Sequence, residues 1–184
     1  MLTKTNQTLL HCYPGLIALI TAKHEDVQNV MAAGWHSYMS FDPPIYGVAI
    51  GEGRFTHDLI TQSGAYAVNF LPAEKAKEIE ESGKMTGADG DKLEALQLDW
   101  QESENLGVPI LTDAYVAYEC EVRDQNTYGD HDWFVADIRG FYQDEKTFQE
   151  NGLPNFSNIT LPLYLGQSHF IFADKNATIK KVDD

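Results

Sequence analysis

Two neighbouring groups of residues in the sequence are suited to bind a flat, anionic ligand. Residues 32–34 (Ala-Ala-Gly) leave the backbone bare, and Trp35 directly after them offers a large, rigid aromatic face. Residues 51–54 (Gly-Glu-Gly-Arg) form a turn whose glycines free backbone N–H groups to point at an anion. Arg54 adds a fork-shaped positive partner for that anion. Together these residues predict a site for a planar ligand with an anionic end.

A short helix is expected directly after this turn, over residues 56–62. Thr56 is predicted to cap the helix, which begins near His57 and is closed by Ser63 and Gly64. A helix N-terminus favours an anion because its unpaired N–H groups and its dipole are both positive. We therefore expect the anionic group at residues 51–57, with Thr56 either as a cap alone or also as a ligand.

The charge balance limits the class of partner. The chain has 184 residues and a formal net charge of −15, which argues against nucleic-acid binding because phosphate contacts need a basic surface. The same imbalance makes the three arginines, Arg54, Arg123 and Arg139, informative. A lone arginine is usually a solvated surface residue, but the glycines around Arg54 favour an anion site there.

The composition is that of a globular chain, with 43% hydrophobic and 11% aromatic residues. No apolar run approaches the about 20 residues that a membrane span needs. The first 15 residues lack the basic region and apolar core of a secretory signal. We expect one domain over residues 1–184, cytoplasmic and without membrane association, with a polar arm at 1–11 and a frayed tail at 174–184.

The cysteines and histidines form no recognisable site. Cys12 and Cys120 lie far apart without a CxxC motif, so both are expected to be reduced. Cys120 sits in the strand-like sequence AYVAYECEV and is expected to be a small buried hydrophobe. The six histidines are scattered, and no metal site is predicted. No hydrolase triad and no GxGxxG fingerprint occur either.

Short apolar runs separated by turn signals predict a mainly β protein with a few short helices. The expected strands are residues 14–22, 27–33, 45–50, 65–71, 111–124 and 133–142, and residues 161–173 are expected to give a closing strand after a turn at Gly166. The expected helices are residues 56–62, 73–81 and 91–98, the second of them charged and read as a solvated surface helix. Residues 82–91 and 143–158 are expected to be irregular. Composition alone does not distinguish an antiparallel barrel from a sandwich.

Several phrases of the sequence occur in the same order as in one known family. NVMAAGW, SFDPP, IGEGRFTHDLI, YAVNFLP, GKMTGADGDKLE and YGDHDWFVADIRG resemble the flavin reductase-like, flavoredoxin-like family of FMN-binding split barrels. The resemblance covers about residues 14–140 and implies an antiparallel split barrel. It also implies FMN as the cofactor, with FAD less favoured, and NADH or NADPH as a co-substrate. Members usually form homodimers with the flavin near the interface, and an electron acceptor or monooxygenase is a further partner.

This chain departs from the family at two positions. Ser82 stands where relatives carry a cysteine, and Ala88 stands where they carry an arginine. The first change argues against thiol chemistry there, and the second removes a phosphate contact. Lys84 and Thr86 are weak substitutes for the missing arginine.

The residues and the resemblance together define a candidate flavin site. Backbone N–H groups at 31–35 and the hydroxyls of Ser37 and Ser40 are candidates to bind the pyrimidine edge of the flavin. Phe55 packs on the ribityl chain or simply anchors the helix, and Met31 and Trp35 have core packing as their alternative. The predicted cofactor-binding residues are Asn29, Met31, Ala32, Ala33, Gly34, Trp35, Ser37, Ser40, Gly51, Arg54, Phe55, Thr56, His57 and Thr86.

His131, in the Gly-Asp-His turn, is the titratable group expected beside the flavin ring and is the candidate catalytic residue. The equally weighted alternative is a turn histidine that bonds the loop backbone. Reduction of FMN by NADH or NADPH is the predicted activity. A flavoredoxin-type electron carrier and a plain flavin-binding module remain alternatives, since all three need the same slot. We also expect a homodimer, with residues 82–90 and 143–158 reaching across a two-fold axis to close each site.

Overall fold

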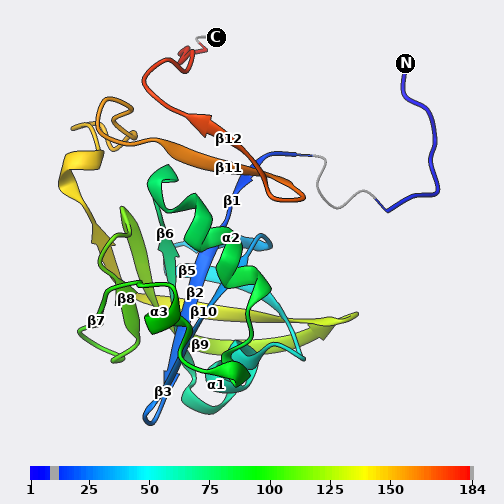
Figure 1. The fold of residues 1–184 in the computed structure, drawn as a ribbon, viewed down its shortest axis with the longest axis vertical. Coiled ribbons are helices and arrows are strands. Elements are labelled where there is room, and N and C mark those ends of the chain that lie inside the picture. Colours follow the sequence, from blue (N-terminus) through cyan, green and yellow to red (C-terminus); the bar gives the residue numbers. More distant parts are fainter. Residues whose placement is uncertain (9–12, 183–184) are drawn as a thin grey trace.

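The computed structural model describes residues 1–8 and 13–182 and is built around one antiparallel sheet (Figure 1). Seven strands follow one another in the order β3-β2-β6-β9-β10-β5-β4. They are β2 (Ala18–His24), β3 (Val27–Ala33), β4 (His36–Phe41), β5 (Pro44–Gly51), β6 (Ala65–Phe70), β9 (Val116–Tyr128) and β10 (His131–Gln143). The expectation of a mainly β, antiparallel protein is confirmed.

The order of the strands explains how the sheet closes. Its two edge strands, β3 and β4, are consecutive in the chain and are separated only by Gly34 and Trp35. The sheet must therefore curl until its edges meet, which turns it into a barrel. Close to this junction the Ala49 backbone N–H donates to the Trp35 carbonyl at 2.9 Å. The gap between the two edges is the split of the barrel, and it lies at the residues first singled out in the sequence.

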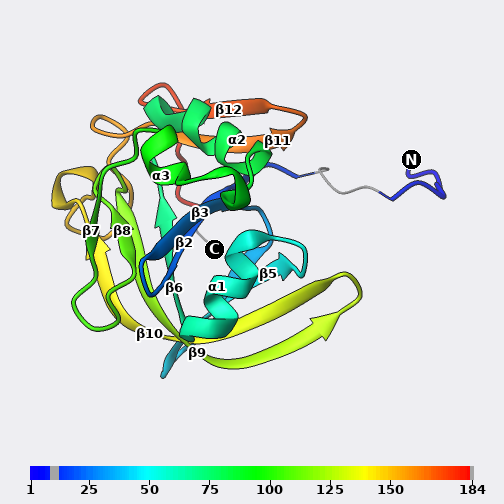
Figure 2. The same ribbon diagram turned by 60° about the horizontal axis from the view of Figure 1, so that its bottom comes forward.

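Three α-helices pack around the barrel. They are α1 (Phe55–Ser63), α2 (Ala76–Lys84) and α3 (Lys92–Ala95), with 3₁₀ turns at Ala73–Lys75, Gly87–Asp89 and Glu145–Thr147. Helix α1 lies in the opening between the β2–β3 pair and the β9–β10 hairpin (Figure 2). Gly64 ends α1 in the left-handed region with φ 71°, as the sequence predicted.

Two smaller sheets complete the fold. One joins β1 (Gly15–Leu16), β11 (Leu161–Gly166) and β12 (His169–Ala173), and the other joins β7 (Trp100–Glu102) and β8 (Pro109–Leu111). The β11–β12 hairpin lies next to α2 at one end of the molecule (Figure 1). It therefore provides a second wall opposite the barrel.

The hydrophobic core fills the barrel interior and the space under α2 and α3. Side chains of β10 alternate between buried and partly exposed along most of the strand, as expected for a sheet with one face on the core. Cys120 is fully buried, which confirms its predicted role, whereas Cys12 lies outside the described residues. In the described part of the chain, no helix is long and apolar enough to span a membrane.

Four expectations about elements were wrong. Residues 36–41 form strand β4 rather than a loop, because an edge strand with exposed side chains carries little apolar pattern. The first expected strand is divided at Ile17 into β1 and β2, whereas the turn expected at Gly166 is present and joins β11 to β12. Arg54, not Thr56, is the N-cap of α1, and it makes no side-chain capping bond.

The fourth error concerns the charged helix at 73–81. It is a 3₁₀ turn followed by α2, and α2 extends to Lys84. Two of its own residues, Ile79 and Ser82, are buried, and Ile79 belongs to a hydrophobic core cluster. Helix α2 is a covering element of the pocket described next, not a solvated surface helix.

Candidate functional site

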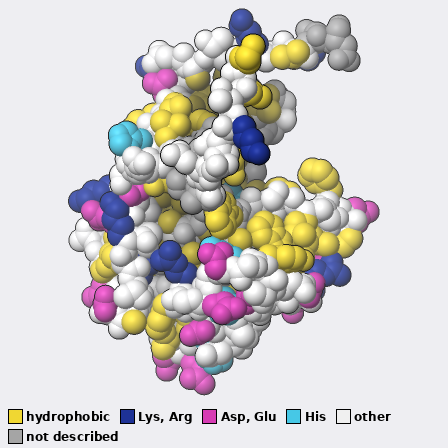
Figure 3. All heavy atoms as spheres, turned by 90° about the vertical axis from the view of Figure 1, so that its right-hand side faces the viewer, with side chains coloured by type: hydrophobic (Ala, Val, Ile, Leu, Met, Phe, Trp, Pro, Cys, Tyr) yellow, Lys and Arg dark blue, Asp and Glu magenta, His cyan; other side chains and the backbone are white. Residues whose placement is uncertain are grey.

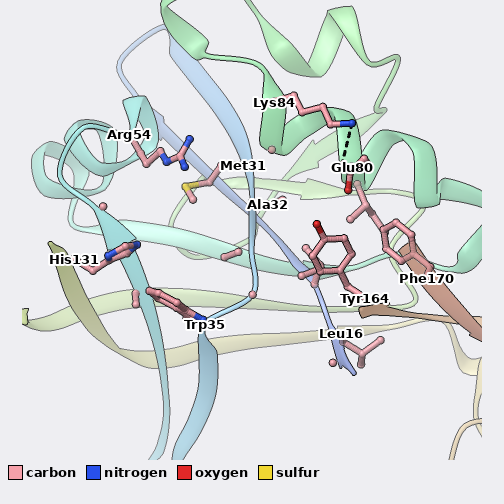
Figure 4. Close-up of a pocket in the computed structure, with 18 of the residues that line it drawn as sticks. Leu16, Met31, Ala32, Trp35, Arg54, Glu80, Lys84, His131, Tyr164 and Phe170 are labelled. Atoms are coloured by element: carbon pink, nitrogen blue, oxygen red, sulfur yellow. Dashed lines mark ion pairs between the residues drawn. The ribbon is translucent and has the colours of Figure 1, made fainter. Parts of the chain in front are cut away.

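The main candidate site is a cavity of about 380 Å³ between the barrel and the β11–β12 hairpin. Figure 4 shows Trp35 and His131 on one side of it and Tyr164 and Phe170 on the other. Helix α2 contributes Glu80 and other residues between the two walls. We call this cavity the slot; its lining is Tyr13, Gly15, Leu16, Ile17, Met31, Ala32, Ala33, Gly34, Trp35, Ala49, Gly51, Arg54, Ile79, Glu80, Gly83, Lys84, His131, Tyr164 and Phe170.

The inner wall of the slot is formed by small residues at the end of an edge strand. Ala32 and Ala33 close β3, and Gly34 follows them. Because β3 has a partner strand only on one side, alternate backbone N–H groups point away from the sheet. Small side chains let a flat ligand approach these donors. The wall therefore has the composition expected for a planar, hydrogen-bonding ring.

Trp35 and His131 form an aromatic corner of the slot. Their ring centroids are 4.8 Å apart, with a tilt of 53° between the planes. His131 Nδ1 lies 2.8 Å from Asp130 Oδ1, and this bond is the main reason why the pKa of Asp130 is lowered. The histidine is thus oriented by a side chain rather than by the loop backbone, and its ring lines the slot.

A second cavity, of about 130 Å³, continues the slot toward the N-terminus of α1. Four residues, Met31, Ala32, Arg54 and Gly83, line both cavities, so the two cavities adjoin. We call this second part the recess; its other lining residues are Asn29, Gly53, Phe55, Thr56, Ser82, Met85, Thr86, Gly87 and Lys92.

Lys92 is the most unusual residue of the recess. Its side chain is only 2% exposed, and Nζ donates to the carbonyls of Ser82 at 2.6 Å and Met85 at 3.2 Å. These carbonyls belong to the C-terminal end of α2, where the helix dipole favours a cation. Burial first, and then the nearby Arg54 guanidinium, lower the pKa of Lys92 to about 8.

The two cations of the recess lack anionic partners. Neither Arg54 nor Lys92 forms an ion pair with a carboxylate within residues 1–8 and 13–182. An ammonium has three N–H groups, and Lys92 uses two of them on backbone carbonyls. One donor is left for a ligand. In a chain of net charge −15, two such cations side by side make the recess a candidate anion site.

Helix α1 is fixed to two strands, β3 and β10. On the β3 side, Asn29 Nδ2 donates to Thr56 Oγ1 at 2.8 Å, and Asn29 is only 1% exposed. Asn29 Oδ1 is buried and has no hydrogen-bond partner among the residues that the structure describes, so an acceptor remains unused beside the recess. A Cβ at Gly87 would come within 2.7 Å of that oxygen, so only glycine fits there.

On the β10 side, His57 Nε2 donates to Asp132 Oδ2 at 2.7 Å. Gln125 donates to the same oxygen, and Thr127 donates to Oδ1, both at 2.6 Å. The bonds from Thr127, His57 and Gln125 lower the pKa of Asp132 to about 2. This buried network holds the helix whose N-terminus forms the recess.

The structure brings most of the predicted site residues together. Met31, Ala32, Ala33, Gly34, Trp35, Gly51, Arg54 and His131 line the slot, and Asn29, Phe55, Thr56 and Thr86 line the recess. Ser37 and Ser40 lie on β4 and line neither cavity. His57 also lines neither, because its ring points to Asp132 and packs against Phe134.

Sequence analysis did not identify Lys92 or the outer wall of the slot, which is formed by Tyr164 and Phe170 of the β11–β12 hairpin. Lys92 was passed over as one lysine of an expected helix, although the GDKLE phrase places it at the helix start beside the glycine-rich segment. No motif in the sequence indicated Tyr164 and Phe170, because their strands lie more than a hundred residues after the glycine turn at 51–54. Residues 85–87, expected to reach toward a partner, line the recess of their own chain.

Comparisons with known proteins agree with this arrangement. A family model for the flavin reductase like domain matches residues 10–171. An uncharacterized protein of Pyrococcus abyssi is 34% identical over 164 residues, which cover 89% of this chain and 93% of the relative.

Two solved structures are similar over nearly the whole chain. An FMN-binding protein from Thermus thermophilus with bound 1-cyclohex-2-enone has a TM-score of 0.85 and 30% identity, covering 98% of this chain and 100% of that one. A flavoredoxin of Desulfovibrio vulgaris has a TM-score of 0.84 and 20% identity, covering 97% of each chain. The fold is therefore the split barrel of this group of flavin proteins.

The Asp132 network predicts a pH-dependent loss of stability in Asp132→Asn. Because the folded pKa of about 2 lies below the ordinary 3.8, the contribution of Asp132 is complete above pH 4 and disappears as the pH falls toward 2. Urea unfolding at pH 7 is expected to show a loss of about 1.5–3 kcal/mol, the range for hydrogen bonds to a charged group. The difference from the unmodified protein is expected to shrink as the pH is lowered from 4 to 2.

Asp137→Asn is the matched control on the same strand, since its ion pairs with Arg123 and Arg139 are partly exposed. That variant is expected to lose only about 0–1 kcal/mol. Equal losses in the two variants, or a loss in Asp132→Asn that does not change with pH, would contradict the role given to the buried network.

Proposed function

This chain belongs to the flavin reductase-like family, and we propose that it binds FMN and transfers hydride from NADH or NADPH to it. The observation that carries the proposal is the position of the slot beside a recess whose two cations pair with no carboxylate of the described residues. FMN combines a planar ring with a terminal phosphate, so its two ends match the two cavities. The Thermus thermophilus relative, itself an FMN-binding protein, supports this choice.

The residues present fit this cofactor at both ends. In the recess, Arg54 and Lys92 would bind the phosphate as charged donors, and Thr56 would add a hydroxyl already fixed by Asn29. The unused Asn29 Oδ1 would accept from a hydroxyl of the ribityl chain. In the slot, the β3 edge and the residues up to Trp35 would contact the ring. FMN is preferred to FAD because the recess is small and the sequence has no dinucleotide fingerprint.

Bound FMN supplies the hydride-accepting chemistry, so a protein acid or base is not required for that step. The residues of this chain orient the reactants and exclude water. Trp35 and His131 would border the ring on the barrel side, and Tyr164 and Phe170 would border the slot on the opposite side, where a nicotinamide would have to enter. His131, oriented by Asp130, is the group placed to exchange a proton near the ring.

We also propose that the protein is a homodimer formed through an aromatic patch of Tyr38, Phe41, Tyr118 and Phe141. Neighbouring rings of this patch are 5.5–5.9 Å apart, and Phe41 is 88% and Phe141 59% exposed. Exposed contiguous apolar surface is typical of an interaction site. Figure 3 shows hydrophobic side chains gathered near the middle of one face of the molecule. Strand β4 begins directly after Trp35, so an interface on the patch would lie next to the slot.

The function is tested by the flavin content and redox behaviour of the purified protein. The protein is expected to be yellow, and heat denaturation is expected to release FMN into the supernatant. Anaerobic addition of NADH or NADPH is then expected to bleach the bound flavin. A supernatant without flavin, together with no binding on titration, would contradict the cofactor assignment. FMN that stays oxidised with both nucleotides would favour a flavoredoxin-type electron carrier instead.

Arg54→Ala is expected to weaken FMN binding much more than riboflavin binding, because riboflavin lacks the phosphate. A hydrogen-bonded charge pair contributes about 1.5–3 kcal/mol, which corresponds to a loss of roughly 10- to 100-fold for FMN. The measurement is a fluorescence titration with each flavin. Arg139→Ala is the control, since Arg139 pairs with Glu121 on the surface away from the slot. Equal losses for both flavins would assign Arg54 a structural role.

Light scattering tests the dimer. The unmodified protein is expected at twice its chain mass of 20.6 kDa, whereas Phe41→Asp is expected to be a monomer because it places a charge in the patch. Phe172→Asp is the control, as Phe172 is a similarly exposed phenylalanine on β12. A monomeric unmodified protein, or a dimer that survives Phe41→Asp, would refute this interface.

A further inference from the structure

Three side chains connect the two walls at the outer end of the slot. Ser168, in the turn of the β11–β12 hairpin, donates through Oγ to Glu80 Oε1 of α2 at 2.5 Å. Lys84 Nζ lies 2.9 Å from the same carboxylate oxygen and 3.5 Å from Ser168 Oγ. Figure 4 shows the Lys84–Glu80 pair above Tyr164. Since Glu80 and Lys84 themselves line the slot, this connection lies at the slot and not on a remote surface.

The turn that carries Ser168 is held in a demanding conformation. Gln167 and Ser168 both have positive φ angles, 52° and 62°, as the tight hairpin turns that match strand twist require. Neither residue is a glycine, so this conformation is unfavourable without support from its surroundings. The bonds of Ser168 to Glu80 and Lys84 provide such support.

The same turn is linked to residues that line the slot. The Ser168 backbone N–H donates to the Tyr164 hydroxyl at 3.4 Å. The rings of Tyr164 and Phe170, which flank the turn on β11 and β12, are 5.1 Å apart. A movement of the turn away from α2 would therefore displace both aromatic side chains of the outer wall.

The charge on Glu80 is well maintained at this position. Its side chain is only 19% exposed, so water screens the contact less than at an open surface. The hydroxyl of Ser168, followed by Lys84, lowers the pKa of Glu80 below its ordinary value. Hydrogen bonds to a charged acceptor are stronger than those between neutral groups.

We infer that Glu80, Lys84 and Ser168 form a latch that holds the β11–β12 wall over bound FMN and thereby sets how long the cofactor stays. This inference rests on the proposed function and adds to it that FMN is a retained group rather than a substrate exchanged at each turnover. Release of FMN requires the outer wall to move, and this movement breaks the contacts of Ser168 with α2. The three residues act through Tyr164 and Phe170 and are positioning residues.

The test compares Ser168→Ala and Glu80→Gln with Glu81→Gln. Glu81 pairs with Lys77 at the same i,i+4 spacing on the same helix, but this pair does not line the slot. FMN release is followed by the rise of free-flavin fluorescence after rapid dilution of the FMN-loaded protein, and FMN association is measured separately. Each latch variant is expected to release FMN on the order of 10-fold faster, with association changed far less. Glu81→Gln is expected to behave like the unmodified protein.

Lys84→Arg keeps the positive charge and is expected to release FMN as slowly as the unmodified protein. Lys84→Met removes the charge and is expected to release FMN faster. A release rate that is unchanged in Ser168→Ala and Glu80→Gln, or changed equally in Glu81→Gln, would overturn the latch. Hydrogen exchange of residues 161–173 in FMN-free protein gives a second readout. Exchange is expected to be faster in Ser168→Ala than in Glu81→Gln, and equal exchange would show that the three side chains do not hold the wall.

The two proposals fail in distinguishable ways. Absence of FMN binding by the unmodified protein would refute the proposed function and the residence-time inference together. Tight FMN binding with fast release in every variant would leave the proposed function intact and refute only the latch. Hydrogen exchange does not depend on FMN and decides the mechanical part of the inference in either case.

Discussion

The site depends on a buried ammonium that the protein only partly satisfies. Lys92 gives two hydrogen bonds to carbonyls at the end of α2, next to Arg54, and has no carboxylate partner among the described residues. Burying a cation is unfavourable unless nearby groups of opposite polarity compensate for the lost water. The helix carbonyls supply part of that compensation, and burial together with Arg54 still lowers the pKa of Lys92 to about 8. An anion in the recess would supply the remainder.

The barrel places this recess next to a flat slot because of the order of its strands. Edge strands β3 and β4 are joined through Gly34 and Trp35, so the unpaired edge of β3, the aromatic face and the split occur together. Helix α1 is bonded to Asn29 of β3 on one side and to Asp132 of β10 on the other. These two bonds fix the helix N-terminus relative to the ring-binding wall, which sets the spacing between the two ends of the proposed cofactor.

The sequence predicted the parts of this arrangement that are local. Strand β3, helix α1 with its closing Gly64 and the glycine turn before Arg54 all follow from periodicity and turn chemistry over a few residues. Lys92 and the outer wall did not follow, because they reach the site only through tertiary packing. Strand β4 was missed because the side chains on both faces of this edge strand are largely exposed, so its sequence shows no clear alternation. His57 was misread for the opposite reason: its position suggested a ligand, whereas a partner 75 residues later turns its ring toward the barrel.

The central claim is that the recess between α1 and α3 holds the phosphate of FMN. A crystal structure of the protein with FMN tests it most directly. We expect the phosphate oxygens within hydrogen-bonding distance, about 2.7–3.2 Å, of Lys92 Nζ, the Arg54 guanidinium and Thr56 Oγ1. The ring is expected to lie along residues 31–35. A phosphate bound elsewhere, with Lys92 still bonded only to the carbonyls of Ser82 and Met85, would contradict the account.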